Sequence, residues 1–119
     1  MTKMFETRLY VGTEFTGDGA NIGPVELRDA KKAAGRFLTN AAGNYTVYSH
    51  YGEWTGDDGL SQFSEKGLTY VIVKDDHPGS MAEFWGRRLA EIYSQTCVLV
   101  TVAEIQGAFA YAAPLDKVA

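Results

Sequence analysis

Apolar and polar residues alternate along several parts of this chain, and a period of two is typical of β-strands with one buried face. Residues 7–15 alternate in this way, and two runs rich in aromatic and β-branched residues within residues 47–73 also predict strands. Residues 55–59, rich in glycine and aspartate, separate those two runs and predict a turn. Residues 97–102 form a continuous apolar run, and residues 105–112 a further extended segment. The pattern therefore predicts a first strand, a central hairpin and two C-terminal strands.

Two other segments repeat apolar residues every three or four positions, which predicts amphipathic helices over residues 24–39 and 81–94. Pro24 is a favoured first residue of a helix. Ser80, followed three residues later by Glu83, predicts a capping box at the start of the second helix. The residues expected to be buried are Val25, Leu27, Ala30, Ala34, Phe37 and Leu38 in the first helix and Met81, Phe84, Trp85, Leu89, Ile92 and Tyr93 in the second.

The order of these elements is β-α-β-β-α-β, with one extra strand at the C-terminus. It predicts a single α+β domain over residues 1–119 with a ferredoxin-like fold, in which both helices cover one face of an antiparallel sheet. The tail after about residue 113 is expected to be flexible.

A two-layer fold of this kind leaves one face of its sheet uncovered. Tyr10, Tyr48 and Phe109 would then form an exposed apolar patch, and such patches mark sites of association. Closed cyclic oligomers bury these faces together with the sheet edges. We therefore expect a homo-oligomer and, among the closed forms, a trimer.

The composition of this chain of 119 residues argues against several classes of partner and several cellular locations. A net charge of −4, without any run of Lys and Arg, argues against a general nucleic-acid binder. No apolar run approaches the roughly 20 residues of a membrane span, and residues 1–6 are too short and polar for a signal peptide. Cys97 is the single cysteine, so we expect no internal disulfide and a buried thiol. The expected location is the cytoplasm, with neither membrane nor nucleic acid as a partner.

The hairpin holds the densest mixture of aromatic and titratable residues, so we expect a functional site there. Glu65 lies near the start of the second hairpin strand, where a carboxylate beside aromatic rings can attract a cationic ligand. The alternative is an ordinary exposed glutamate at a strand start. His50, Tyr51 and Trp54 offer stacking and cation–π surfaces for a base or an onium group. For each aromatic residue alone, packing within the sheet is the favoured alternative.

Other chemistries find little support in the spacing of residues. His50 and His77, with the nearby aspartates, match no recognised metal motif, so we expect no metal site. Residues 16–23 form a glycine-rich loop that lacks both the GxGxxG pattern and the lysine of a P-loop, and we interpret it as a connection. No arrangement of a nucleophile with a histidine can be argued from spacing, and we expect no cofactor.

Four short stretches carry a family resemblance. Residues 97–100 (Cys-Val-Leu-Val) and 107–112 (Gly-Ala-Phe-Ala-Tyr-Ala) lie near the C-terminus, residues 64–66 (Ser-Glu-Lys) precede an apolar strand, and residues 54–56 (Trp-Thr-Gly) end another. Together they resemble the phage S-adenosylmethionine-cleaving enzymes, the SAM lyases, in their CVLV strand, the glycine and Tyr-Ala of the segment that follows it, the Glu-Lys at their essential glutamate and their Thr-Gly. The resemblance extends more loosely over most of the chain and implies a PII-like, ferredoxin-like fold.

The resemblance implies an enzyme that cleaves S-adenosylmethionine to 5′-methylthioadenosine and L-homoserine lactone in a site between subunits. The substrate's own carboxylate attacks its γ carbon, so the protein need supply no nucleophile, metal or cofactor. Glu65 would be the catalytic residue, and His50, Tyr51, Trp54 and Phe63 would bind the substrate. A tyrosine of the family has no clear counterpart in this chain, and Tyr51, Trp54 and Phe63 are the candidates to replace it. The implied role is bacteriophage anti-restriction through depletion of S-adenosylmethionine.

Two other functions stay open on the residues alone. A non-catalytic, PII-like trimer would hold a nucleotide or adenosine ligand between subunits and leave it intact. A structural or interaction protein would have no small-molecule site.

Overall fold

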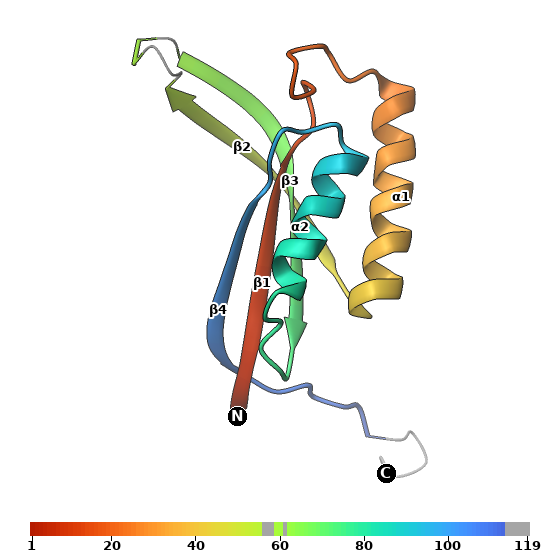
Figure 1. Ribbon diagram of the computed structural model, residues 1–119. Helices are drawn as coiled ribbons and strands as arrows, with labels where there is room; N and C mark the ends of the chain where they lie inside the picture. Colours follow the sequence, from red (N-terminus) through yellow and green to blue (C-terminus); the bar gives the residue numbers. More distant parts are fainter. Residues whose placement is uncertain (56–58, 61, 114–119) are drawn as a thin grey trace.

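Six elements follow one another along the chain in the order strand, helix, strand, strand, helix, strand (Figure 1). The structure, a computed structural model, describes residues 1–55, 59–60 and 62–113, and it does not describe the side chains of residues 54, 55 and 63. The elements are β1 (Thr2–Gly12), α1 (Pro24–Ala42), β2 (Thr46–Thr55), β3 (Gln62–Lys74), α2 (Met81–Ile92) and β4 (Leu99–Gly107).

The strands form one sheet in the order β2-β3-β1-β4, and every neighbouring pair is antiparallel. α1 and α2 lie together on one face of this sheet, and no described element covers the opposite face (Figure 1). Strand order and helix placement confirm the predicted ferredoxin-like α+β fold. The predicted turn at residues 56–58 and the predicted flexible tail at residues 114–119 lie outside the described residues.

The hydrophobic core lies between the helices and one face of the central strands. Leu9 and Val11 of β1 pair with Tyr70 and Leu68 of β3, so these four side chains share that face. The stripe of α1 consists mainly of alanine, and such small side chains allow the helix to lie close to the sheet. The helical residues of the core are Ala30, Ala34, Leu38, Ala42, Trp85 and Leu89, with Tyr93 directly after α2.

β1 differs from the predicted first strand at both ends, since it begins at Thr2 and ends at Gly12. Its early residues pair with β4, a partner that the local pattern does not indicate. Glu14 and Phe15, which were expected to continue the strand, leave the sheet because their N–H groups donate to the side chain of Glu65.

The C-terminal region forms one strand where the sequence pattern predicts two. β4 runs without a break and pairs with β1 from Tyr10 back to Thr2. The prediction of an extra strand is therefore wrong: its first residues belong to β4, and residues 108–113 form no strand. The physical reason is that β1 offers no further partner beyond Thr2. Cys97, expected to be buried in a strand, precedes β4 and is exposed.

α1 continues three residues past its predicted end, to Ala42. Gly43 terminates it with a φ of 87°, in the left-handed region that favours glycine, and its N–H donates to the carbonyl oxygens of Leu38 (3.2 Å) and Thr39 (3.1 Å). The buried stripe repeats every four residues and reaches back only to about Leu27, so the predicted burial of the first-turn residue Val25 is wrong.

The start of α2 departs from prediction in two ways. The capping box is wrong, because the Ser80 side chain makes no capping hydrogen bond; Ser80 itself has helical angles, and its carbonyl oxygen accepts the Phe84 N–H (3.2 Å). Met81 and Phe84, expected in the core, are 43% and 44% exposed. The Phe84 ring lies 5.7 Å from that of Phe37 (centroid to centroid), so it belongs to the contact between the helices rather than to the sheet.

Two buried tyrosines connect β3 to the end of α2. The hydroxyl oxygens of Tyr70 and Tyr93 lie 2.5 Å apart in a hydrogen bond, and the Tyr45 ring packs 5.7 Å from the Tyr70 ring. Burial raises the pKa of both Tyr70 and Tyr93 above the ordinary value of a phenol. The folded chain therefore keeps both protons at a pH where the unfolded chain, with a pKa near about 10, loses them.

Stability should consequently fall as the pH rises above about 10. The variant Tyr93→Phe removes one of the two buried phenols. We expect it to lower the unfolding free energy at neutral pH by about 1 kcal/mol, because a hydrogen bond is lost. We also expect it to lose less stability than the parent chain at alkaline pH. Urea denaturation at neutral pH and above about pH 10 measures both effects.

Tyr111→Phe is the matched control, because Tyr111 is 89% exposed and the loss of its hydroxyl should leave the pH dependence unchanged. An equal alkaline loss in Tyr93→Phe and in the parent chain would contradict the role given to the buried pair.

Candidate functional site

The hairpin of β2 and β3 extends beyond the end of β1 (Figure 1). Gly12, the last residue of β1, pairs with Gly67, so the earlier residues of β3 pair with β2 alone. Glu65 lies two residues before this point. Its side chain therefore stands where β1 leaves the sheet and the chain turns into the loop that leads to α1.

Glu65 binds that loop through its carboxylate. Oε2 accepts the backbone N–H of Glu14 at 3.0 Å and that of Phe15 at 3.1 Å. The side chain is half-buried. Two amide donors on one oxygen fix the direction of the carboxylate, as backbone N–H groups do for anions elsewhere.

Glu14 completes the connection in the opposite direction. Its Oε1 accepts the Lys66 N–H at 2.6 Å, while the Lys66 carbonyl oxygen accepts both the N–H and the hydroxyl of Thr13, at 3.1 and 3.2 Å. Sequence reasoning did not find Glu14, because its importance arises from β3, which is distant along the chain. The only signal was a carboxylate directly after an alternating segment.

His50 lies on the same face of the sheet as Glu65. In β2, His50 stands opposite Gly67 and Gly52 stands opposite Glu65, and residues two apart share a face. This face is the one that no helix covers, since Leu68 and Tyr70 point the other way. His50 Nδ1 lies 2.8 Å from Thr69 Oγ1, and its ring packs edge-on against Tyr10 with centroids 6.0 Å apart.

The other predicted binding residues are placed differently. Tyr51 alternates with His50, so it projects from the opposite face of the hairpin, where it is 62% exposed. Trp54 and Phe63 pair with each other in register, and their side chains lie outside the described part of the structure. Within one chain the structure thus brings Glu65 and His50 to one face, and it places Tyr51 on the other.

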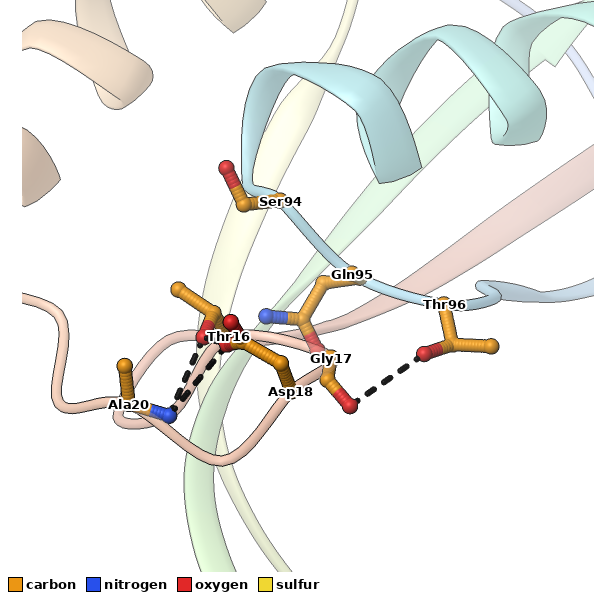
Figure 2. Close-up of a pocket in the computed structure, with 7 residues that line it drawn as sticks. All are labelled: Thr16, Gly17, Asp18, Ala20, Ser94, Gln95 and Thr96. Atoms are coloured by element: carbon orange, nitrogen blue, oxygen red, sulfur yellow. Dashed lines mark hydrogen bonds between the residues drawn. The ribbon is translucent and has the colours of Figure 1, made fainter.

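The loop after β1 is also bonded to the segment after α2. The Gly17 N–H donates to the Ser94 carbonyl oxygen (2.7 Å), and Gln95 Nε2 donates to the Phe15 carbonyl oxygen (2.7 Å). An open polar hollow of about 590 Å³ lies between these segments (Figure 2). Its lining residues are Thr16, Gly17, Asp18, Ala20, Ser94, Gln95 and Thr96.

The polar groups of this hollow bond largely to one another. The Thr16 hydroxyl donates to the Asp18 carboxylate, and the Ala20 N–H donates to Thr16 Oγ1 (3.1 Å) and Asp18 Oδ1 (3.4 Å) (Figure 2). The Thr16 bond and then the Ala20 bond lower the pKa of Asp18 below its ordinary value. We interpret the hollow as the surface of an ordered loop, in keeping with the connection predicted for residues 16–23.

The N–H and carbonyl groups of Phe15 connect Glu65 to Gln95, which lines the hollow. The Phe15 N–H donates to Glu65, and the Phe15 carbonyl oxygen accepts from Gln95. Glu65 is therefore linked through one residue to the end of α2, and hence to the core.

The two histidines lie apart. His77 packs on Phe5, near the other end of β1, with ring centroids 5.1 Å apart, and its Nδ1 accepts the Gly79 N–H at 2.9 Å. Among the residues that the structure describes, no group of three or more His, Cys, Asp and Glu side chains is placed to hold a metal ion. In the same part of the chain, no helix is long and apolar enough to cross a membrane.

The connection through Glu65 predicts a difference between two substitutions. Glu65→Ala leaves the Glu14 and Phe15 N–H groups without an acceptor, whereas Glu65→Gln keeps a carbonyl oxygen for them. We expect hydrogen exchange of these two amides to rise about tenfold or more in Glu65→Ala and to change little in Glu65→Gln. Amide exchange followed by NMR measures this, with the exposed hairpin variant Glu53→Ala as control. Equal protection in all three variants would show that the loop does not depend on Glu65.

No family model matches the sequence, and a search of curated proteins finds no match. Solved structures do match. A phage SAM lyase in complex with S-methyl-5′-thioadenosine has a TM-score of 0.60 at 16% identity, over 85% of this chain and 81% of that chain. Its apo state has a TM-score of 0.60 at 18% identity, over 84% of this chain and 79% of that chain. The B. subtilis GlnK–ATP complex has a TM-score of 0.53 at 16% identity, over 88% of this chain and 84% of that chain. The chain thus shares the PII-like, ferredoxin-like fold of these proteins, which confirms the resemblance to phage SAM lyases at the level of the fold.

Proposed function

We propose that this chain cleaves S-adenosylmethionine into 5′-methylthioadenosine and L-homoserine lactone, in a site on the uncovered face of the sheet. The observation that carries the proposal is the placement of Glu65. The acidic residue to which the family resemblance points is half-buried, oriented by two backbone N–H groups, and on the same open face as His50. The fold shared with phage SAM lyases supports the same reaction.

The reaction asks for geometry rather than for a reactive side chain. The substrate's carboxylate oxygen bonds to its γ carbon, the bond between that carbon and sulfur breaks, and the electron pair stays on sulfur as a neutral thioether. The ammonium keeps one positive charge on the lactone, so the charges balance without water or proton transfer. The protein's part is to fold the substrate into the attack geometry and to keep water away.

In this proposal Glu65 holds the ammonium end of the substrate. Both N–H bonds fall on Oε2, and the substrate's ammonium is proposed to bind at Oε1. The sulfonium loses its charge in the transition state, so a carboxylate beside it would stabilise the ground state more and slow the step. The ammonium keeps its charge throughout, and binding it does not oppose the reaction.

The adenine is proposed to stack near His50, whose ring lies beside Tyr10 on the open face. Tyr51 projects from the other side of the hairpin. It would therefore reach a substrate only across an interface between subunits. Trp54 and Phe63 are proposed to complete the substrate-binding residues.

A homotrimer would supply that interface. A row of paired residues crosses all four strands on the uncovered face, and it consists of Tyr48, Thr69, Tyr10 and Leu99. Tyr48 is 58% and Leu99 62% exposed, which is a large apolar area for a free surface. We propose that three chains meet over this face and act in the cytoplasm of a phage host, where loss of S-adenosylmethionine would oppose restriction.

The second candidate is a non-catalytic trimer that binds an adenosine-type ligand. The fold shared with the GlnK–ATP complex supports it. The two candidates differ in one observable, since a binding module would leave the ligand intact.

Incubation with S-adenosylmethionine, followed by chromatography, tests the proposed reaction. We expect methylthioadenosine and homoserine lactone to appear faster than in a protein-free control. Glu65→Gln should abolish turnover while the fold persists, because the amide keeps the loop bonds and loses the charge. Glu53→Gln, an exposed change in the same hairpin, should retain activity.

The outcomes separate the candidates. Full activity of Glu65→Gln would remove Glu65 from the mechanism. Intact substrate together with a raised melting temperature in S-adenosylmethionine would favour the binding module, and intact substrate without any shift would exclude both.

Native mass spectrometry tests the trimer. We expect three chains in the parent protein and monomers in Leu99→Glu, since a charge on the uncovered face opposes its burial. Val25→Glu is the matched control on the helical layer, where Val25 is 55% exposed. A monomeric parent protein would refute the proposed interface, and so would an undisturbed trimer in Leu99→Glu.

A further inference from the structure

Two glycines face each other beneath the candidate site. Gly12 of β1 is paired with Gly67 of β3, and both lie on the uncovered face, in line with Tyr10 and Thr69. Neither has a positive φ, so the backbone conformation does not require glycine at either position. Glycine weakens a strand relative to other residues. The reason for a facing pair must therefore lie in the space above it.

The space above Gly12 is filled by Glu65. A Cβ atom at residue 12 would lie 2.6 Å from Oε2 and 2.7 Å from both Cδ and Oε1. These separations are far inside the usual contact distance of about 3.5 Å. The whole carboxylate thus occupies the place of the missing side chain, and from there it reaches the amides of Glu14 and Phe15.

The space above Gly67 is filled by His50 in the same manner. A Cβ atom at residue 67 would collide with Nε2 of the ring and with the Val11 carbonyl oxygen. The ring is therefore able to lie over the strand, with Nδ1 at hydrogen-bond distance from Thr69.

Gly52 provides the contrast. It stands opposite Glu65 in β2 and on the same face, yet a Cβ atom there would meet no described atom within 4 Å. Close packing is therefore a property of Gly12 and Gly67 and not of every glycine on this face.

We infer that Gly12 and Gly67 are positioning residues, which together form a notch in the sheet that seats the Glu65 carboxylate and the His50 ring side by side. The Cα atoms of directly paired residues lie only about 5 Å apart, so groups seated over them are neighbours. The notch explains how side chains from β2 and β3 converge on one point of a flat face. It rests on the proposed function insofar as these two groups bind the substrate.

Gly12→Ala carries the test, because the three atoms nearest to its Cβ all belong to the movable end of the Glu65 side chain, whereas the Cβ of Gly67→Ala also meets main chain. We expect Gly12→Ala to displace the Glu65 carboxylate. Hydrogen exchange of the Glu14 and Phe15 amides should rise about tenfold, and kcat/KM for S-adenosylmethionine should fall about a hundredfold. Gly52→Ala, the matched control, should alter neither quantity.

A double-mutant cycle separates positioning from general damage. In a Glu65→Ala background the carboxylate is gone, so adding Gly12→Ala should not change the exchange of the Glu14 and Phe15 amides further. If Gly12→Ala does not fold, the double variant should still fold, since the carboxylate atoms nearest to the new methyl group are gone.

Three results would overturn the inference: unchanged exchange and kcat/KM in Gly12→Ala, the same loss in Gly52→Ala, or an equal further loss of amide protection in the Glu65→Ala background. If the parent chain leaves S-adenosylmethionine intact, the proposed function fails. In that case the amide-exchange cycle alone decides whether the notch positions Glu65.

Discussion

The carboxylate of Glu65, bonded to two peptide N–H groups, holds together three segments that are far apart in sequence. It fixes where β1 ends, because Glu14 and Phe15 bond to it instead of continuing the ladder. It fixes the start of the loop to α1. Through the Phe15 carbonyl oxygen and Gln95 it is also connected to the end of α2. A charged acceptor makes stronger bonds than a neutral one, so a single side chain can order a long connection.

The two faces of the sheet have different roles. One face and the helices form the core, where burial of apolar groups supplies the stability. The other face takes no part in that core and holds Glu65, His50 and the exposed side chains of Tyr48 and Leu99. The candidate site lies where β1 leaves the sheet. Paired strands bound it on one side, and the other side is open.

The alternation and helical periodicity of the sequence were enough to predict the order of elements, both helices and the hairpin, because each depends on local pattern. Three of the errors have a common cause. The length of β4 depends on β1, the burial of Phe84 depends on α1, and the end of β1 depends on Glu65. None of these partners is near in sequence.

Contacts between residues distant in sequence also limited the prediction of the candidate site. Glu65 and His50 were found as types of residue in a dense stretch, and their common face follows from counting along β2 and β3. Glu14 escaped notice because its partner is Lys66, and the opposite placement of Tyr51 appears only once the register is known. The one signal in the sequence, a carboxylate directly after a strand, does not identify its partner.

The donors to Glu65 are peptide groups, and a peptide group is the same whichever amino acid carries it, proline excepted. The aromatic ring at position 15 could be replaced in the course of evolution without moving its N–H. A related chain would keep this arrangement if it had the same backbone path, an acidic residue at position 65 and glycine at position 12. Most other side chains around Glu65 take no part in these two bonds, so the arrangement depends more on the path of the backbone than on the identity of the residues along it.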